Sequence, residues 1–136
     1  MTPESSGTPG EDVPLPRVLC DTAALAALDD ASAGALWRLA EPGRQLDANV
    51  VRIPPGHGVG THREPDLDVL LLVLAGRGTL TGPDGPRPLL AGALTWLPHG
   101  STRSLTAGPE GLTYLTVHRR RPGMRIRRGN PADRQQ

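Results

Sequence analysis

His62 and Glu64 stand two residues apart in the segment "THREPDLDVLLLVLAG" (61–76). Side chains at that spacing point to the same side of a β-strand. An imidazole and a carboxylate there could share a divalent metal ion or act as an acid/base pair. Further along the chain, Arg103 offers a permanent cation that donates hydrogen bonds and cannot coordinate a metal. The candidate site can therefore favour either a metal ion or an anion.

The elements that must position these residues read as β-structure. From residue 33 onward, Gly and Pro recur at the short intervals typical of a β-sandwich or barrel. The segment "TGPDGP" (81–86) predicts a hairpin turn, and "DTAALAALDD" (21–30) predicts one short helix capped by Asp21 or Thr22. The expected strands are 35–40, 46–53, 59–62, 68–75, 78–82, 87–90, 93–98, 102–107 and 112–119.

The run "VLLLVLA" (69–75) does not alternate between apolar and polar residues. Such a strand is buried on both sides. One side would face the inside of a barrel, and a second sheet or a second subunit would cover the other. A buried helix is the competing interpretation, which the following Gly-Arg-Gly disfavours. We therefore expect a homodimer.

Composition narrows the classes of function. The 136 residues fit one domain, and the net charge of +1 gives no overall field to attract nucleic acid or a membrane. Every one of the 15 basic residues is Arg, which indicates a bacterial coding bias. The single cysteine, and the absence of a signal-peptide pattern or a long apolar stretch, predict a cytoplasmic protein.

Two segments of this chain resemble the two motifs of the cupin family. The first family motif is G-x5-H-x-H-x3,4-E-x6-G. Gly56, His62 and Gly76 match it, whereas Glu64 stands where the family has its second His and Val69 where it has its Glu. Of the metal ligands that this motif supplies in the family, only His62 is therefore kept.

The second family motif is G-x5-P-x-G-x2-H-x3-N. Gly92, Pro98 and Gly100 match it, but Arg103 stands at the His position and Ala107 at the Asn position. The resemblance covers residues 34–119. It implies an all-β, cupin-like double-stranded β-helix (a jelly-roll barrel) with one short N-terminal helix. We expect this domain to span 17–121, between a disordered arm (1–16) and a basic, partly disordered tail (122–136) that is unlikely to bind nucleic acid.

In such a barrel, His62, Glu64, Val69 and Arg103 would point into one lumen. His62 and Glu64 supply only two metal ligands, and the Arg103 guanidinium would repel a dication. The resemblance therefore implies a degenerate metal site that needs no cofactor. The alternative is a divalent ion (Zn, Mn, Fe or Ni) on His62 and Glu64, with replacement ligands from Asp66, Asp68 or His99.

Without a metal, two interpretations of the lumen stay open. Glu64 and Arg103 could form a buried ion pair that only satisfies itself. Alternatively, Arg103 could present its charge to an anionic ligand that His62 also contacts, with Trp96 and Tyr114 as walls of the lumen. The other histidines, His57, His99 and His118, are expected to be structural or exposed.

The expected function is binding of a small, anionic organic molecule in the barrel lumen. The alternative is a cupin-type enzyme, an isomerase, polyketide cyclase or dioxygenase-like protein, with His62 and Glu64 as metal ligands or as the acid/base pair. A third possibility is an interaction module whose lumen is filled by Leu and Val side chains.

Overall fold

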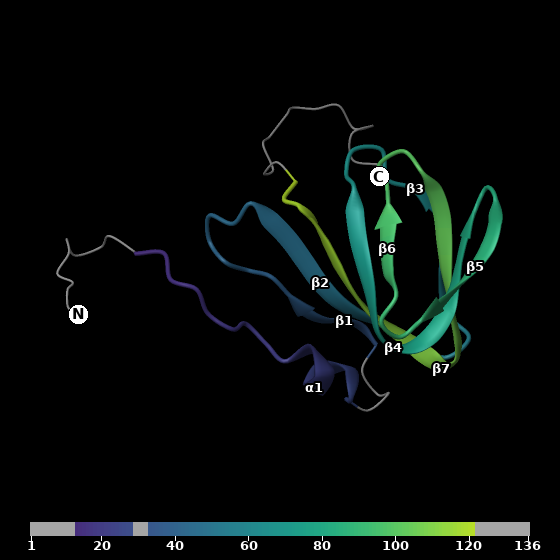
Figure 1. Ribbon diagram of the computed structural model, residues 1–136, viewed down its shortest axis with the longest axis horizontal. Coiled ribbons are helices and arrows are strands. Elements are labelled where there is room, and N and C mark those ends of the chain that lie inside the picture. The colour runs from purple at the N-terminus through teal and green to yellow at the C-terminus, as the bar shows by residue number, and fades with distance from the viewer. Residues whose placement is uncertain (1–12, 29–32, 122–136) are drawn as a thin grey trace.

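The computed structural model describes residues 13–28 and 33–121 (Figure 1). Residues 1–12 of the expected arm and the expected tail (122–136) lie outside the described residues, and residues 13–16 are extended. The elements in chain order are α1 (Thr22–Ala26), β1 (Gly34–Arg38), β2 (Leu46–Ile53), β3 (Gly58–Arg63), β4 (Val69–Gly82), β5 (Gly85–Leu90), β6 (Leu94–Leu97) and β7 (Thr102–Arg119).

Two antiparallel layers form the barrel because β4 and β7 each contribute to both. The C-terminal half of β7 and the N-terminal half of β4 pair with each other, and β2 and β6 flank them. With β1 outside β2, this layer is sheet A. The other halves of β7 and β4 also pair, flanked by β3 and β5, and this layer is sheet B. All pairings are antiparallel, so the all-β jelly-roll expectation is confirmed.

Glycines allow the two long strands to bend from one sheet into the other. Gly76 and Gly111 have φ values of +76° and +84°. A Cβ on Gly76 would lie 2.1 Å from the Gly111 carbonyl oxygen, so the two bends touch each other. The expected strands 68–75 and 78–82 are therefore one strand, as are 102–107 and 112–119. Gly76, which stands between two expected strands, is a bend within β4. Gly56, Gly92 and Gly100, in contrast, do lie in turns.

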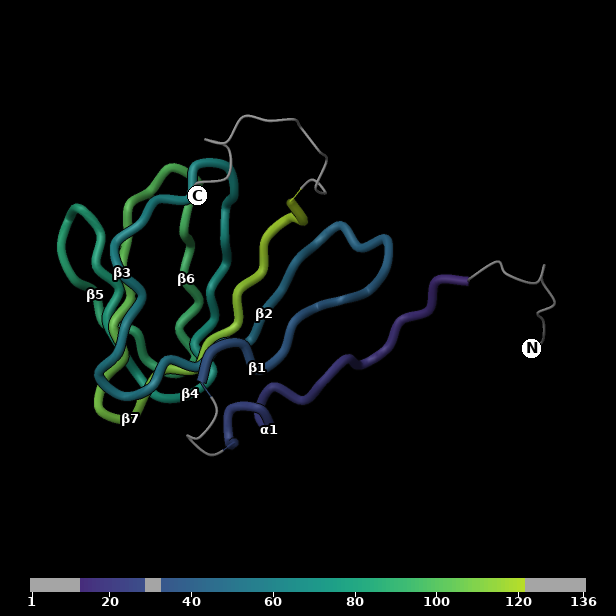
Figure 2. Tube along the Cα trace, turned by 180° about the vertical axis from the view of Figure 1, so that it is seen from behind, coloured from purple at the N-terminus to yellow at the C-terminus, as the bar shows by residue number. Residues whose placement is uncertain are grey.

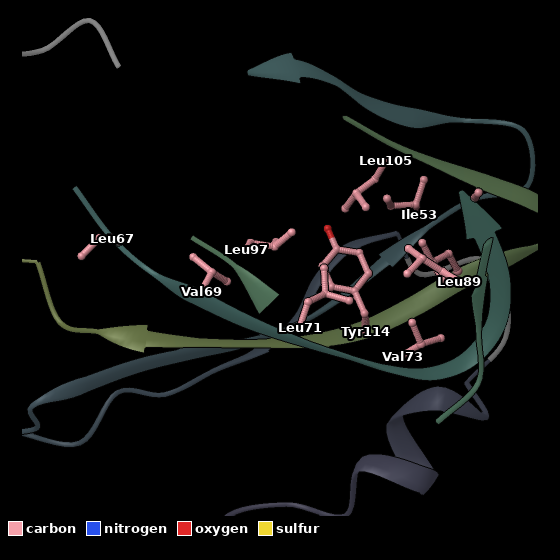
Figure 3. Close-up of a cluster of buried hydrophobic side chains, with 11 residues drawn as sticks. Ile53, Leu67, Val69, Leu71, Val73, Leu89, Leu97, Leu105 and Tyr114 are labelled. Atoms are coloured by element: carbon pink, nitrogen blue, oxygen red, sulfur yellow. The ribbon is translucent and has the colours of Figure 1, made fainter. Parts of the chain in front are cut away.

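The core lies between the sheets (Figure 3). Val69, Leu71 and Val73 point inward from β4 and are at most 8% exposed. Leu105 and Tyr114 meet them from the two halves of β7. The remaining members of this core cluster are Ile53, Leu67, Leu89, Leu97, Ala107 and Leu112. The prediction that "VLLLVLA" is a strand is confirmed, but its predicted burial on both sides is not found in the single chain: the inner side is buried, whereas Leu70 on the outer side is 42% exposed.

The helix is shorter than the sequence predicts. Asp21 caps α1, because its Oδ1 accepts hydrogen bonds from the N–H groups of Ala23 (3.0 Å) and Ala24 (3.3 Å). α1 packs against β2 and β4, while the chain before it runs alongside the β1–β2 hairpin (Figure 2). Among the described residues, no helix is long and apolar enough to cross a membrane.

Candidate functional site

Both ends of β7 lie at one mouth of the barrel. The strand begins there at Thr102, bends at Gly111 and returns to the mouth at Arg119, as its two arms show (Figure 1). A cavity of about 350 Å³ opens at this mouth, and we call it the lumen cavity. Its lining residues are His62, Glu64, Leu67, Val69, Leu97, Arg103, Thr116, His118 and Arg121. The structure thus brings together the four residues that were expected to share one lumen.

Arg103 is buried, with 6% of its surface exposed. It stands opposite His62 in the β3–β7 register. Its Nη1 donates to Ser101 Oγ at 2.9 Å and, more weakly, to the Ser101 carbonyl oxygen at 3.4 Å. Burial lowers the pKa of Arg103, and the negative charge of Glu64 opposes that change. The guanidinium remains a cation whose only hydrogen-bond partner within the described chain is one neutral residue.

Glu64 pairs with Arg121 and not with Arg103. Arg121 Nη2 lies 2.5 Å from Glu64 Oε1, and the Asp66 N–H donates to Glu64 Oε2 at 2.9 Å. Burial would raise the pKa of Glu64, but these hydrogen bonds and the Arg121 charge together hold it below its usual range. The Glu64–Arg103 ion pair, one of the two interpretations of the lumen from the sequence, is therefore not formed within the described residues. Arg121, which directly follows β7, pairs with the Glu64 carboxylate instead.

One ring nitrogen of His62 has no hydrogen-bond partner among the residues that the structure describes. Its Nδ1 lies 3.0 Å from the Gly60 carbonyl oxygen, so Nδ1 donates in the neutral ring. Nε2 is then left as the acceptor. His62 can accept a proton or a hydrogen bond from a ligand in the lumen cavity.

His118, Thr116 and Arg121 also line the lumen cavity, although the sequence interpretation did not place them there. Thr116 and His118 follow Tyr114 at two-residue steps, so strand alternation from that inward-facing tyrosine points to both. His118 was expected to be structural or exposed. Its Nδ1 lies 2.7 Å from the Arg119 carbonyl oxygen, which again leaves Nε2 as the acceptor.

Trp96 and Tyr114 do not line the lumen cavity. Trp96 lies on β6 beside Leu70 of β4 and is 57% exposed on the outer side of sheet A. Leu97, the next residue, takes the inward position instead. Tyr114 points inward but packs within the apolar core (Figure 3), where burial raises the pKa of its hydroxyl group. The expectation that both form walls of the ligand site is corrected.

The residues at the mouth do not fit a metal ion. Among residues 13–28 and 33–121, no three His, Cys, Asp or Glu side chains lie close enough together to hold one. Arg121 occupies the Glu64 carboxylate, and Arg103 adds a second positive charge to the same cavity. Asp68, a possible replacement ligand, instead accepts hydrogen bonds from the His99 backbone N–H (2.9 Å) and ring Nδ1 (2.7 Å).

A second cavity of about 460 Å³ adjoins the first, and we call it the rim cavity. It shares Leu67 and Arg121 with the lumen cavity. Its other lining residues are Pro65, Asp66, His99 and Arg119. The mouth therefore has an inner and an outer compartment with a common wall.

No protein-family model matches the sequence, and neither does any curated protein. Solved structures do match the fold. The BH2720 protein of Bacillus halodurans superposes with a TM-score of 0.64 at 20% identity, covering 82% of this chain and 86% of that one.

Two further neighbours are described as cupins. The Cnp3 cupin domain of Schizosaccharomyces pombe has a TM-score of 0.56 at 17% identity, over 62% of this chain and only 59% of its own. A sugar phosphate isomerase from a cupin superfamily of Silicibacter pomeroyi has a TM-score of 0.53 at 22% identity, over 70% of this chain and 76% of that one. The two bent layers define a double-stranded β-helix barrel. The resemblance to cupins is confirmed, and this chain has the cupin fold.

Proposed function

We propose that this protein binds a small anionic organic molecule in the lumen cavity, without the metal ion that the cupin motifs would hold. The buried Arg103 guanidinium carries this proposal. It faces the lumen cavity with Ser101 as its only hydrogen-bond partner among the described residues. Because Glu64 is occupied by Arg121, the cavity keeps an uncompensated positive charge that an anion would neutralise.

The other lining residues suit such a ligand. His62 and His118 offer ring nitrogens and Thr116 a hydroxyl group, while Leu67, Val69 and Leu97 supply an apolar wall. A cavity of about 350 Å³ accommodates a small organic molecule. A carboxylate on Arg103 would form a charge-assisted hydrogen bond in a partly water-excluded position. The apolar wall would then select for the hydrocarbon part of the ligand, and Arg103 would select for its negative charge.

Arg103→Gln tests this proposal because Gln keeps hydrogen-bonding capacity and removes the charge. Isothermal titration with short carboxylates should show at least about tenfold weaker binding for this variant. Arg87→Gln is the matched control, since Arg87 lies on β5 in an exposed pair with Asp84. Binding that Arg103→Gln leaves unchanged, or no binding of any small anion to the unaltered protein, would contradict the proposal.

An enzyme using the same cavity is the second candidate. The neighbour of this fold from Silicibacter pomeroyi is described as a sugar phosphate isomerase, and a sugar phosphate is itself an anion. Here His62 Nε2 would be the base, because the lowered pKa of Glu64 keeps that carboxylate ionised and unable to donate a proton. A bound anion that is converted by the unaltered protein but not by His62→Gln would favour this candidate. A bound anion that is never converted would favour binding alone.

Metal analysis separates both candidates from the metalloenzyme alternative. Protein purified without chelators should hold far less than one equivalent of Zn, Mn, Fe or Ni. A stoichiometric ion that is lost in His62→Ala would instead indicate that His62 coordinates a metal.

A further inference from the structure

The lumen cavity and the rim cavity together have the form of a site for a ligand with two charged ends. They meet at Leu67 and Arg121, which line both. Leu67 is 1% exposed and apolar, so it would contact the middle of a molecule that reaches from one cavity into the other. Arg103 lines the lumen cavity, and Arg119 and His99 line the rim cavity.

The rim cavity has an unpaired positive charge of its own. Arg119 Nη2 donates only to the Asp66 carbonyl oxygen, at 3.4 Å, and no carboxylate lies within ion-pairing distance of Arg119 in the described part of the chain. The Asp66 side chain is the one carboxylate that lines this cavity, opposite Arg119, Arg121 and His99. Because Arg121 is already paired with Glu64 and His99 with Asp68, Arg119 is the cation of this cavity that a second anionic group would bind.

Asp68 holds His99 in place at the rim. Asp68 Oδ1 accepts from the His99 backbone N–H and lies 2.7 Å from its Nδ1, while His99 itself lines the rim cavity. These two hydrogen bonds lower the pKa of Asp68, so its carboxylate stays ionised. The Asp68 carboxylate therefore fixes the orientation of the His99 ring.

We propose that the ligand of this protein is a dianion, a small molecule with one anionic group on Arg103 in the lumen cavity and a second on Arg119 in the rim cavity. This inference rests on the proposed function, since Arg103 must first bind the inner group. The shared wall at Leu67 selects a short apolar linker between the two groups. A dicarboxylate or a phosphorylated carboxylic acid has this chemistry.

Titration calorimetry with matched probes tests the dianion. Succinate, glutarate and adipate are compared with butyrate, valerate and hexanoate. At least one diacid should bind about tenfold more tightly than its monoacid. Arg119→Gln should remove that difference and leave the monoacid affinity unchanged, whereas Arg103→Gln should weaken both. Arg87→Gln, at a residue that lines neither cavity, should change neither. A phosphorylated short acid, compared with the diacids, identifies the preferred outer group.

The possible failures are distinguishable. If no diacid exceeds its monoacid, or if Arg119→Gln leaves the difference intact, the dianion is overturned while the lumen site stands. If Arg119→Gln weakens the binding of monoacids and diacids equally, Arg119 acts through long-range electrostatic attraction and does not bind a second anionic group. If Arg103→Gln changes nothing, the proposed function itself fails.

The outer face of sheet A carries a separate feature. The strand registers align Trp37, Val50, Leu115, Leu72 and Leu94 in one row across five strands. Ala48, Val117, Leu70 and Trp96 form the next row. Paired residues point to the same side of a sheet. We call these nine positions the outer apolar face, and none of them is polar or charged.

Within residues 13–28 and 33–121, only one end of the outer apolar face is covered. Val50 is fully buried on the side where α1 packs against β2 and β4. Exposure rises toward β6: Leu70 on the neighbouring β4 is 42% exposed, and Trp96 and Leu94 on β6 are 57% and 67% exposed. The described arm does not cover them, since its own Val13 and Leu15 are 69% and 70% exposed as it runs along the β1–β2 hairpin (Figure 2).

We infer that a second copy of this chain covers the exposed part of the outer apolar face. Residues 1–12 contain only Met1 as a large apolar residue, and residues 122–136 only Met124 and Ile126, so neither segment has the side chains to cover it. A typical dimer interface buries about 800 Å² per partner around an apolar, charge-poor centre. This face supplies such a centre, and a twofold axis would bring it against itself.

Molecular mass in solution tests this interface. Sedimentation equilibrium of the full chain should give a dimer, and both Leu70→Arg and Trp96→Arg should give folded monomers, because a buried unpaired charge at the interface is costly. Leu90→Arg on β5 is the matched control, since Leu90 is also apolar and 55% exposed but lies on the outer side of sheet B, next to the buried Leu89. That variant should remain a dimer.

A monomeric unaltered protein would overturn this interface. So would a dimer that both face variants retain, or one that is lost when residues 1–19 are removed but kept in Leu70→Arg and Trp96→Arg. In the latter case the arm, and not the sheet face, would join the two copies. Circular dichroism of each variant confirms that it is folded before its mass is interpreted.

Discussion

The two ends of the barrel use the same strands for opposite purposes. At the closed end, β4 and β7 bend over each other at Gly76 and Gly111, and the neighbouring Leu112 is fully buried. At the mouth, the same two strands present Val69, Arg103 and His118 to the lumen cavity. The closed end is tightly packed and includes one charged side chain, Arg52, whose guanidinium lies beside Gly111 and whose buried Nε has no hydrogen-bond partner among the described residues. The mouth instead opens into a cavity lined by charged side chains. The tightest packing and the proposed binding site thus lie at opposite ends of one pair of strands.

The largest effect is expected from Gly76→Ala at the closed end. The added Cβ would meet the Gly111 carbonyl oxygen at 2.1 Å, at a backbone φ of +76° that alanine disfavours. Overpacking and the strained φ together should lower the free energy of unfolding by about 3 kcal/mol or more. Urea denaturation measures this. Gly92→Ala is the control, with φ +91° but nothing within 4 Å, and should cost only about 1 kcal/mol. Equal losses of stability in both variants would show that the close contact between the bends at Gly76 and Gly111 can be opened at little cost.

The opposite sign is expected at the mouth for Arg103→Leu. Burial of a guanidinium with one neutral partner is unfavourable, and Leu adds apolar contact with Leu97 and Val69. The free energy of unfolding should rise by about 1 kcal/mol as anion binding is lost. Urea denaturation and calorimetry on the same preparation test both effects. A less stable variant would mean that Arg103 supports the fold and that the two ends do not differ in this respect.

A smaller, pH-dependent effect is expected for Glu64→Gln. The pKa of Glu64 is below its unfolded-state value of 4.5 in the folded protein, so the carboxylate stabilises the fold above that pH. Its contribution decreases as the pH falls through the folded pKa. Glu64→Gln should therefore lose about 0.5 kcal/mol at pH 7 and much less at about pH 3.

Unfolding curves at both pH values provide the measurement. Glu110→Gln, which removes an exposed partner of Arg77 at the other end of the barrel, should match the unaltered protein throughout. If Glu64→Gln gives the same loss at both pH values, the ionised carboxylate is not the source of the stability.

Much of the fold could be predicted because turns depend on local chemistry. Gly56, Gly92, Pro98 and Gly100 lie at or beside turns whose spacing is visible in the sequence. Gly76 misled the strand count, since a glycine bend within a strand and a glycine turn between strands look alike in sequence. Only the close approach of Gly111, a long-range contact, distinguishes them.

The candidate site was predicted in part. His62, Glu64 and Arg103 line one cavity, as the two motifs implied. The partner of Glu64 was not predictable, because Arg121 lies just beyond the last strand and reaches the mouth only when β7 has folded back. Trp96 was misplaced because the inward phase of a four-residue strand such as β6 cannot be decided from so few residues. His118 was predictable, since it lies four residues after the inward-facing Tyr114.

The return of β7 to the mouth also bears on how the protein folds. The strand pairs Arg119 with Leu46 and Thr102 with Arg63, so both of its arms join segments that are far apart in sequence. Closing such long loops costs entropy before any contact is gained, which slows folding in proteins dominated by distant pairings. The lumen cavity draws its walls from residue 62 to residue 121 and is complete only when the last arm of β7 has docked. The proposed ligand binding therefore requires that both arms of β7 have docked.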